Sequence, residues 1–424
     1  MSDLTQRILA SVDEGFEEQI AYTETLGRFP SLRGQEATAQ DFLHSDLKAR
    51  GYAMDRWVID VDDIKAHPGF SPVDIDYSNA VNVVGTHRPR AEKGRSLVLN
   101  GHMDVVPAGP LEMWSSPPFE PRRDGDWLYG RGIADMKAGI AANVFAVEAL
   151  RRIGYQPAAT LYQQSVIEEE CTGNGALSAL LRGYNADAAI IPEPEDDKLV
   201  RANIGVLWFR VRVQGAPVHV REAGSGANAI EAAYDVIRAL RGLEADWNAR
   251  KGQHRYFEDL DHPINFNVGK IRGGDWASSV PAWCEIDCRI AIYPGTSAPE
   301  AAREIEDHLR AAATHVPFLA NNPPQITWNG FFAEGYVLEE GSDAEAALGR
   351  AHLAAYSRPL ESFVTPGYLD GRVFAIYGKT ACLVYGPYSE CIHGFDERVS
   401  LPSVRRVTGA IALFIADWCG LEEI

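Results

Sequence analysis

The sequence of 424 residues has no long apolar run and a shortage of positive charge. No uninterrupted apolar segment approaches the roughly 20 residues that a membrane-spanning helix needs. The polar N-terminus has no apolar core of the kind found in signal peptides. The formal net charge is −19, from 40 Lys and Arg against 59 Asp and Glu. Since nucleic acids and anionic membranes attract basic surfaces, we expect neither as a partner.

Cysteine is also scarce, because only six are present and none form a C-x-x-C pair. Few, widely separated cysteines are typical of reduced thiols and not of a disulfide framework. We therefore predict a cytoplasmic protein. Cys171 and Cys391 lie beside candidate metal ligands, but for both the sequence favours a buried packing role over metal binding.

The length favours two domains, because 424 residues exceed the size of one ordinary core. The predicted order of elements from Val206 to Phe332 is strand, helix, two strands, helix and strand, which is typical of a ferredoxin-like domain. We predict an α/β protein whose catalytic domain has a mixed, mainly parallel sheet flanked by helices. That domain would comprise residues 1–203 and 334–424, with an inserted ferredoxin-like lid and dimerisation domain at residues 204–333.

Four motifs between Ser96 and Glu195 carry the chemistry. In each motif, a His, Asp or Glu stands at the end of an apolar run or in the turn before a helix. Apolar runs with β-branched residues are typical of buried parallel strands, whose carboxyl ends meet at one edge of a sheet. An imidazole and several carboxylates at one edge suit a pair of divalent ions, which would also relieve the repulsion between the carboxylates. The motifs are SLVLNGHMDVVP (96–107), GRGIADMKAG (130–139), QSVIEEECTGNG (164–175) and AAIIPEPE (188–195).

With SLRGQE near the N-terminus and IHGFDERV near the C-terminus, these motifs resemble a zinc-dependent family. Its members include acetylornithine deacetylase, succinyl-diaminopimelate desuccinylase, aminoacylase and glutamate carboxypeptidase. The likeness covers almost the whole chain, and five separated motifs occur in the family's order. It implies two divalent ions, with zinc favoured and cobalt or manganese as alternatives. The ligands that it implies are His102, Asp135, Glu170, Glu193 and His393.

The resemblance also implies roles around the ions. Asp135 would bridge them and be joined to Met136 by a cis peptide. Asp104 would orient the imidazole of His102. Glu169 would act as general base, taking a proton from the attacking water and returning it to the leaving amine. His219 resembles a lid histidine that the other subunit contributes to stabilise the oxyanion.

Four further residues match substrate-binding positions of the family. Arg289 resembles an arginine that binds a substrate carboxylate, for which a guanidinium is well suited. Asn228 corresponds to a residue that positions substrate, and Ser278 stands where the family often has asparagine. Gly367 belongs to PGYLDGR, where the family has roughly G-G-T-D-A-R, so that Tyr368 adds bulk to the pocket wall.

We therefore predict hydrolysis of the amide in a small N-acyl amino acid, of acetylornithine deacetylase type. Two alternatives use the same machinery: a dipeptidase or carboxypeptidase, and an amidohydrolase of an N-acyl aromatic or heterocyclic amine. An inactive scaffold is disfavoured because Glu169 and every ligand are present. A homodimer is expected, because the lid sheet has an edge strand that can pair with a second copy.

Overall fold

The central sheet of the computed structural model, which describes residues 3–424, has six strands in the order β1-β2-β7-β3-β8-β16. Strands β7, β3, β8 and β16 run parallel, whereas β1 and β2 pair antiparallel with their neighbours. The predicted mixed, mainly parallel sheet is therefore confirmed. The strands are β1 (Ala53–Val58), β2 (Val81–His87), β3 (Leu97–His102), β7 (Leu161–Val166), β8 (Ala188–Ile191) and β16 (Ala381–Val384).

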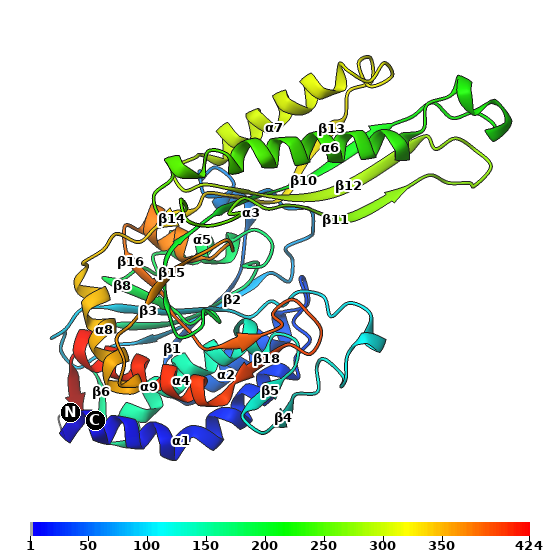
Figure 1. Cartoon of the computed structure of the whole chain (residues 1–424). Coiled ribbons are helices and arrows are strands. Elements are labelled where there is room, and N and C mark those ends of the chain that lie inside the picture. The colour runs from blue at the N-terminus through cyan, green and yellow to red at the C-terminus, as the bar shows by residue number, and fades with distance from the viewer. Residues whose placement is uncertain (1–2) are drawn as a thin grey trace.

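Helices cover both faces of this sheet (Figure 1). Helices α1, α2, α4 and α9 lie on the face away from the upper part of the molecule, and α5 lies on the opposite face. Helix α4 is alanine-rich and almost wholly buried, because small side chains let a helix approach the sheet closely. The helices are α1 (Asp3–Gly27), α2 (Ala37–Ala49), α4 (Ala138–Arg152), α5 (Asn174–Leu181), α8 (Asp343–Tyr356) and α9 (Leu401–Trp418).

A second, four-stranded sheet forms the upper part of the molecule with two helices (Figure 1). Its order is β11-β12-β10-β13, every pair is antiparallel, and the chain order is β10-α6-β11-β12-α7-β13. This is the predicted ferredoxin-like unit, here called the lid (residues 205–333); the domain boundaries stay a prediction. Its elements are β10 (Gly205–Gln214), α6 (Ala229–Asn248), β11 (Phe266–Gly273), β12 (Trp283–Ile292), α7 (Ala298–Ala313) and β13 (Gln325–Ala333).

The lid has its own apolar core, separate from that of the central sheet. Every second residue of β12 from Cys284 to Ile290 is buried, as expected for a strand with one face against helices. Helix α7 begins with a capping box, in which Ser297 and Glu300 bond each other's backbone N–H groups. A proline also lies in its first turn, so local sequence signals determine where this helix begins.

Several short elements were not predicted. A four-stranded sheet in the order β17-β18-β5-β4 joins the segment before Asp135 to the segments on either side of His393. Helix α3 (Val61–Ile64) is a single turn, capped by the side chain of Asp60, which accepts the backbone N–H of Asp62. The short strands are β4 (Arg122–Asp124), β5 (Trp127–Tyr129), β6 (Tyr155–Pro157), β9 (Leu199–Asn203), β14 (Tyr336–Val337), β15 (Ser362–Thr365), β17 (Ser389–Glu390), β18 (Arg398–Ser400) and β19 (Leu421–Glu423).

All six cysteines are free. Cys391 is exposed, so the prediction that it packs in the interior is wrong, and Cys171 is half-buried. Neither belongs to a group of candidate metal ligands within residues 3–424. Over the same residues, no helix combines the length and apolar character needed to cross a membrane.

Candidate metal centre and active site

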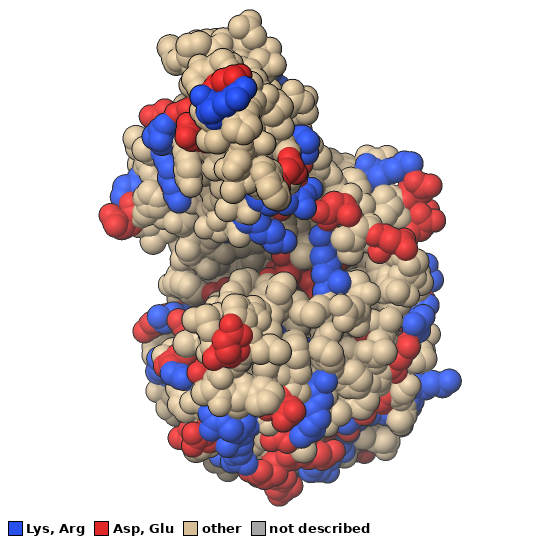
Figure 2. All heavy atoms as spheres, turned by 90° about the vertical axis from the view of Figure 1, so that its right-hand side faces the viewer, with Lys and Arg blue, Asp and Glu red and all other residues tan. Residues whose placement is uncertain are grey.

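A hollow separates the lid from the body of the molecule, and acidic side chains lie at its floor (Figure 2). Three of the five candidate ligands, and the candidate base, come from the carboxyl ends of the central strands. His102 is the last residue of β3, Glu169 and Glu170 follow β7, and Glu193 follows β8. Since these strands are parallel neighbours, their ends meet at one edge of the sheet, as predicted.

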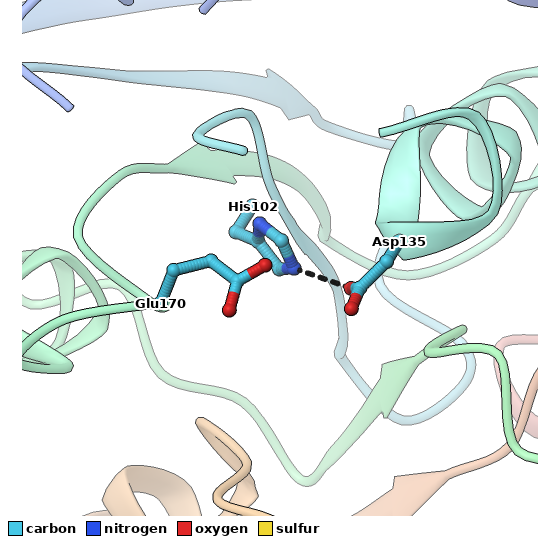
Figure 3. A group of neighbouring side chains, drawn as sticks. All are labelled: His102, Asp135 and Glu170. Carbon is cyan, nitrogen blue, oxygen red and sulfur yellow. Dashed lines mark hydrogen bonds and ion pairs between the residues drawn. The ribbon is translucent and has the colours of Figure 1, made fainter. Parts of the chain in front are cut away.

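Asp135 lies between two imidazoles. Its Oδ1 is 3.1 Å from Nε2 of His102, and its Oδ2 is 3.3 Å from Nε2 of His393. The carboxylate of Glu170 is also 3.1 Å from Nε2 of His393. Figure 3 shows His102, Asp135 and Glu170 pointing toward one another. The Asp135–Met136 peptide is cis, as the resemblance implied.

Two groups of side chains have ligand atoms close enough to share an ion. His102, Asp135 and Glu170 form one group, and His102, Glu169 and Glu193 form the other. Within each group all ligand atoms lie within 4.8 Å of one another. Oε1 of Glu193 is 3.6 Å from Nε2 of His102. The structure thus brings together all five predicted ligands and the predicted base.

The donor set fits divalent cations. Oε1 of Glu193 is buried and has no hydrogen-bond partner, which is costly unless a positive group binds it. Burial raises the pKa of Glu193 to about 8, and it also raises the pKa of both Glu169 and Glu170. Burial therefore outweighs the neighbouring imidazoles of His102 and His393, and further positive charge would stabilise these carboxylates. Imidazole and carboxylate ligands together suit zinc, and also cobalt or manganese.

Asp104 is buried at the centre of the site and contacts the imidazole of His102 mainly through its backbone. Nδ1 of His102 lies 2.9 Å from the backbone carbonyl oxygen of Asp104 and 3.6 Å from its carboxylate. The carboxylate instead accepts the backbone N–H groups of Glu169 and Glu170, at 3.4 and 3.1 Å. Asp104 therefore fixes both the imidazole and the glutamate segment.

The first glutamate of the triplet, Glu168, faces away from this group. Its backbone has a φ of 66°, and its carboxylate is 2.5 Å from Nε of Arg33 and 2.6 Å from the hydroxyl of Tyr77. Because Glu168 is held in this way, the next two glutamates are the ones available to the metal centre. The role of Arg33 was not predicted, although it lies in the SLRGQE motif.

The predicted lid residues lie apart from the ligands. His219 and Ser278 are exposed on adjoining loops, where a β-bridge pairs His219 with Ser279 and the Ser278 carbonyl accepts the Val220 N–H. Within residues 3–424, no hydrogen bond or ion pair joins His219 to a candidate ligand; its Nδ1 accepts the backbone N–H of Arg221 at 3.2 Å. The Asn228 side chain caps helix α6 by accepting two backbone N–H groups, so its oxygen is engaged locally.

Arg289 and Gly367 lie near each other where β12 meets the body. The guanidinium donates to the carbonyl of Pro366, the residue before Gly367, at 3.3 Å. No carboxylate between residues 3 and 424 forms an ion pair with Arg289, and burial lowers its pKa. Such an unpaired guanidinium is available to an anionic group.

Known proteins with similar sequences identify the family of this chain. Residues 98–417 match the model of peptidase family M20/M25/M40. An N-formyl-4-amino-5-aminomethyl-2-methylpyrimidine deformylase of Halalkalibacterium halodurans is 29% identical, covering 99% of this chain and 98% of that protein. A succinyl-diaminopimelate desuccinylase of Cupriavidus taiwanensis is 30% identical, covering 90% and 94%.

The fold is also similar to that of solved structures. The dipeptidase Dug1p from Saccharomyces cerevisiae superposes with a TM-score of 0.78 and 16% identity, covering 99% of both chains. The family match spans most of the chain, and it includes the five candidate ligands and Glu169. The chain therefore belongs to peptidase family M20/M25/M40, a family of metal-dependent hydrolases, and its relatives act on amide C–N bonds.

Proposed function

We propose that this protein is a two-metal amidohydrolase that removes a short acyl group, formyl foremost, from the amine of a small heterocyclic molecule. The observation that carries the reaction type is the placement of Asp135 between His102 and His393 among buried carboxylates. The similarity over almost the full length to a protein named as a formyl-aminopyrimidine deformylase supports the substrate class. The acetylornithine deacetylase type predicted first has no such support.

Each ion would have its own terminal ligands. His102 and Glu193 would hold one ion, Glu170 and His393 the other, and Asp135 would contact both. When bound, two divalent ions supply Lewis acidity, which lowers the pKa of a water towards about 7. Zinc is the ion that we propose, with cobalt and manganese as alternatives of similar ligand preference.

Glu169 would move the proton. Its carboxylate is buried, and Oε2 lies 4.0 Å from Nε2 of His102, at the edge of the group of ligands. Asp104 holds its backbone N–H and keeps the side chain directed to the centre. Glu169 would accept a proton from the attacking water and then donate it to the amine that leaves, as a general base and acid.

An aromatic cluster between the lid and the body supports a planar amine as substrate. The ring centroids of Phe331 and Tyr368 are 4.2 Å apart, and those of Trp208 and Phe331 are 5.2 Å apart. Trp208 and Tyr368 are only half-buried, so part of each ring is free to contact a ligand. Stacking against such rings favours an aromatic heterocycle over an aliphatic amino acid.

A second candidate is an N-acyl amino acid with a free carboxylate. The observation that favours it is the unpaired guanidinium of Arg289. Since the protein carries a net charge of −19, an anionic substrate would need such a placed cation. In this case Arg289→Lys would lose activity although the charge is kept, because an ammonium group cannot bind both carboxylate oxygens in the same way.

A substrate panel separates the two candidates. For the zinc-loaded protein we expect the highest kcat/KM with an N-formyl aminomethylpyrimidine, followed by its N-acetyl analogue. N-formyl amino acids and their carboxamides, compared at fixed ionic strength, form the second arm. A clear preference for the acid over its carboxamide, lost in Arg289→Lys, would replace the first candidate by the second. Failure to hydrolyse any amide in the panel would contradict the proposed function.

We also propose a homodimer in which His219 reaches the neighbouring active site. Its imidazole is exposed and, among residues 3–424, forms no hydrogen bond or ion pair with a candidate ligand, and β11 is an edge strand with an exposed Ile271. Edge strands pair readily with a second copy. Asn228 and Ser278 would support this lid loop, and Gly367 would line the pocket beside Arg289.

Mixed dimers test the placement of His219. Neither His219→Ala nor Glu169→Gln homodimers should be active, but a dimer of one chain of each should regain activity. One of its two sites would combine an intact Glu169 with an intact His219 from the other chain. Purified mixed dimers, made with two different affinity tags, should be assayed beside both homodimers. Absence of recovery would show that His219 acts in its own chain or has no role.

A further inference from the structure

The segments that carry Asp135 and His393 are joined by two short strands. Strand β5 (Trp127–Tyr129) pairs antiparallel with β18 (Arg398–Ser400), placing Tyr129 opposite Arg398. The backbone N–H of Gly130 then donates to the carbonyl of Glu397 at 3.0 Å. The loops that carry Asp135 and His393 are both anchored at this pair of strands, and the two side chains come together at the metal centre.

The side chain of Glu397 binds the loop that holds Asp135. Its Oε1 accepts the backbone N–H groups of Ala134 and Asp135, at 3.0 and 3.2 Å. Its Oε2 accepts the N–H of Gly132 at 3.1 Å and Nη1 of Arg131 at 2.5 Å. Glu397 is 1% exposed, so water does not compete for these contacts. Each carboxylate oxygen therefore binds two donors.

The partner of Glu397, Arg131, binds the other loop. Its Nη2 donates to the carbonyl of Gly394, the neighbour of His393, at 2.9 Å. The guanidinium is 1% exposed and stacks over the ring of Trp114, with 5.1 Å from its central carbon to the ring centroid. The ion pair thus bonds the backbone on both sides of the 3.3 Å gap between Asp135 and His393.

We propose that the ion pair between Arg131 and Glu397 is a positioning element for the metal centre. It would fix the separation of Asp135 from His393, and so the affinity for the ion that these two share with Glu170. A buried ion pair adds little net stability compared with apolar packing, so its value here lies in geometry. Residues that hold metal ligands in place commonly change metal affinity about 10–100-fold when replaced. The inference rests on the metal-binding part of the proposed function and not on the substrate.

Glu397→Gln is the most direct test, because the side chain keeps its size. In either orientation the amide nitrogen faces two donors, so half of the contacts are lost. We expect about 10–100-fold weaker binding of one of the two ions, measured by competition with a chromophoric chelator. The d–d absorption of the cobalt-loaded protein should change as well. The affinity for the other ion, held by His102 and Glu193, should fall less, because Asp135 is the only ligand of that ion whose backbone Glu397 binds.

Glu345→Gln provides the matched control. Glu345 pairs with the nearly buried Arg201, and neither residue contacts a candidate ligand among residues 3–424. A purely structural effect would lower the melting temperature of the metal-free protein in both variants and leave both metal affinities unchanged. Affinities are to be compared at a temperature at which near-ultraviolet circular dichroism shows each variant folded.

Wild-type affinities and a wild-type cobalt spectrum in folded Glu397→Gln would overturn the proposal. Should this variant not fold, Arg131→Lys gives the same readouts, since lysine keeps the charge but cannot bind Glu397 and Gly394 together. A wild-type protein that binds fewer than two ions would also overturn it. If the wild type binds two ions but hydrolyses no amide, the proposed function fails and this inference stands.

Discussion

Replacing Glu169 by glutamine should lower kcat by roughly 10²–10⁴-fold, the usual contribution of a general base. Both metal ions should remain bound. The side chain is buried beside His102, and an amide of the same size can neither take a proton from water nor return one to the amine. The measurement combines kcat on an N-formyl substrate with elemental analysis of the dialysed protein.

Glu170→Gln is the control for the triplet. The Glu170 carboxylate is 3.1 Å from Nε2 of His393, so this variant should lose metal and not merely proton transfer. Glu168 is engaged with Arg33 and Tyr77, which leaves Glu169 and Glu170 as the two candidates. If Glu169→Gln lost metal while Glu170→Gln kept it, the roles of these two residues would be exchanged.

Glu193→Gln should weaken the binding of one ion by more than the roughly 10–100-fold expected for a residue that only holds a ligand in place. The reason is that Glu193 would contact the ion directly. Each 100-fold loss removes about 2.7 kcal/mol of the stabilisation that saturating zinc provides. Oε1 has no hydrogen-bond partner, so the amide loses no hydrogen bond there in the metal-free protein.

Thermal unfolding with and without zinc measures this effect. The increase in melting temperature on adding zinc should shrink in Glu193→Gln, while the melting temperature in chelator stays close to that of the wild type. An increase equal to that of the wild type would show that Glu193 is not a ligand.

The parts of the fold that depend on short, bounded apolar runs could be predicted from the sequence. The runs that end at His102 and Ile191 are buried strands, because parallel strands covered on both faces need continuous apolar residues. The order of helices and strands in the lid could be predicted because each of these six elements is long enough for its apolar pattern to repeat. Convergence of His102, Glu170 and Glu193 then follows from parallel pairing.

Other features depend on contacts that no local pattern encodes. Strands β5 and β18 have three residues each, too few for an alternation to be seen. The contact between Arg131 and Glu397 spans 266 residues and follows only from that pairing. Asn228 is different, since asparagine before a helix is a known N-cap signal that could have identified its local role.

A zinc titration of metal-free protein, followed by hydrolysis of an N-formyl amide, tests most directly whether two ions in this acidic group drive amide hydrolysis. We expect activity to reach its maximum at two zinc ions per chain and to vanish again on chelation. Glu169→Gln should bind the same two ions without activity. Full activity after exhaustive chelation, or a maximum at one ion per chain, would contradict the account.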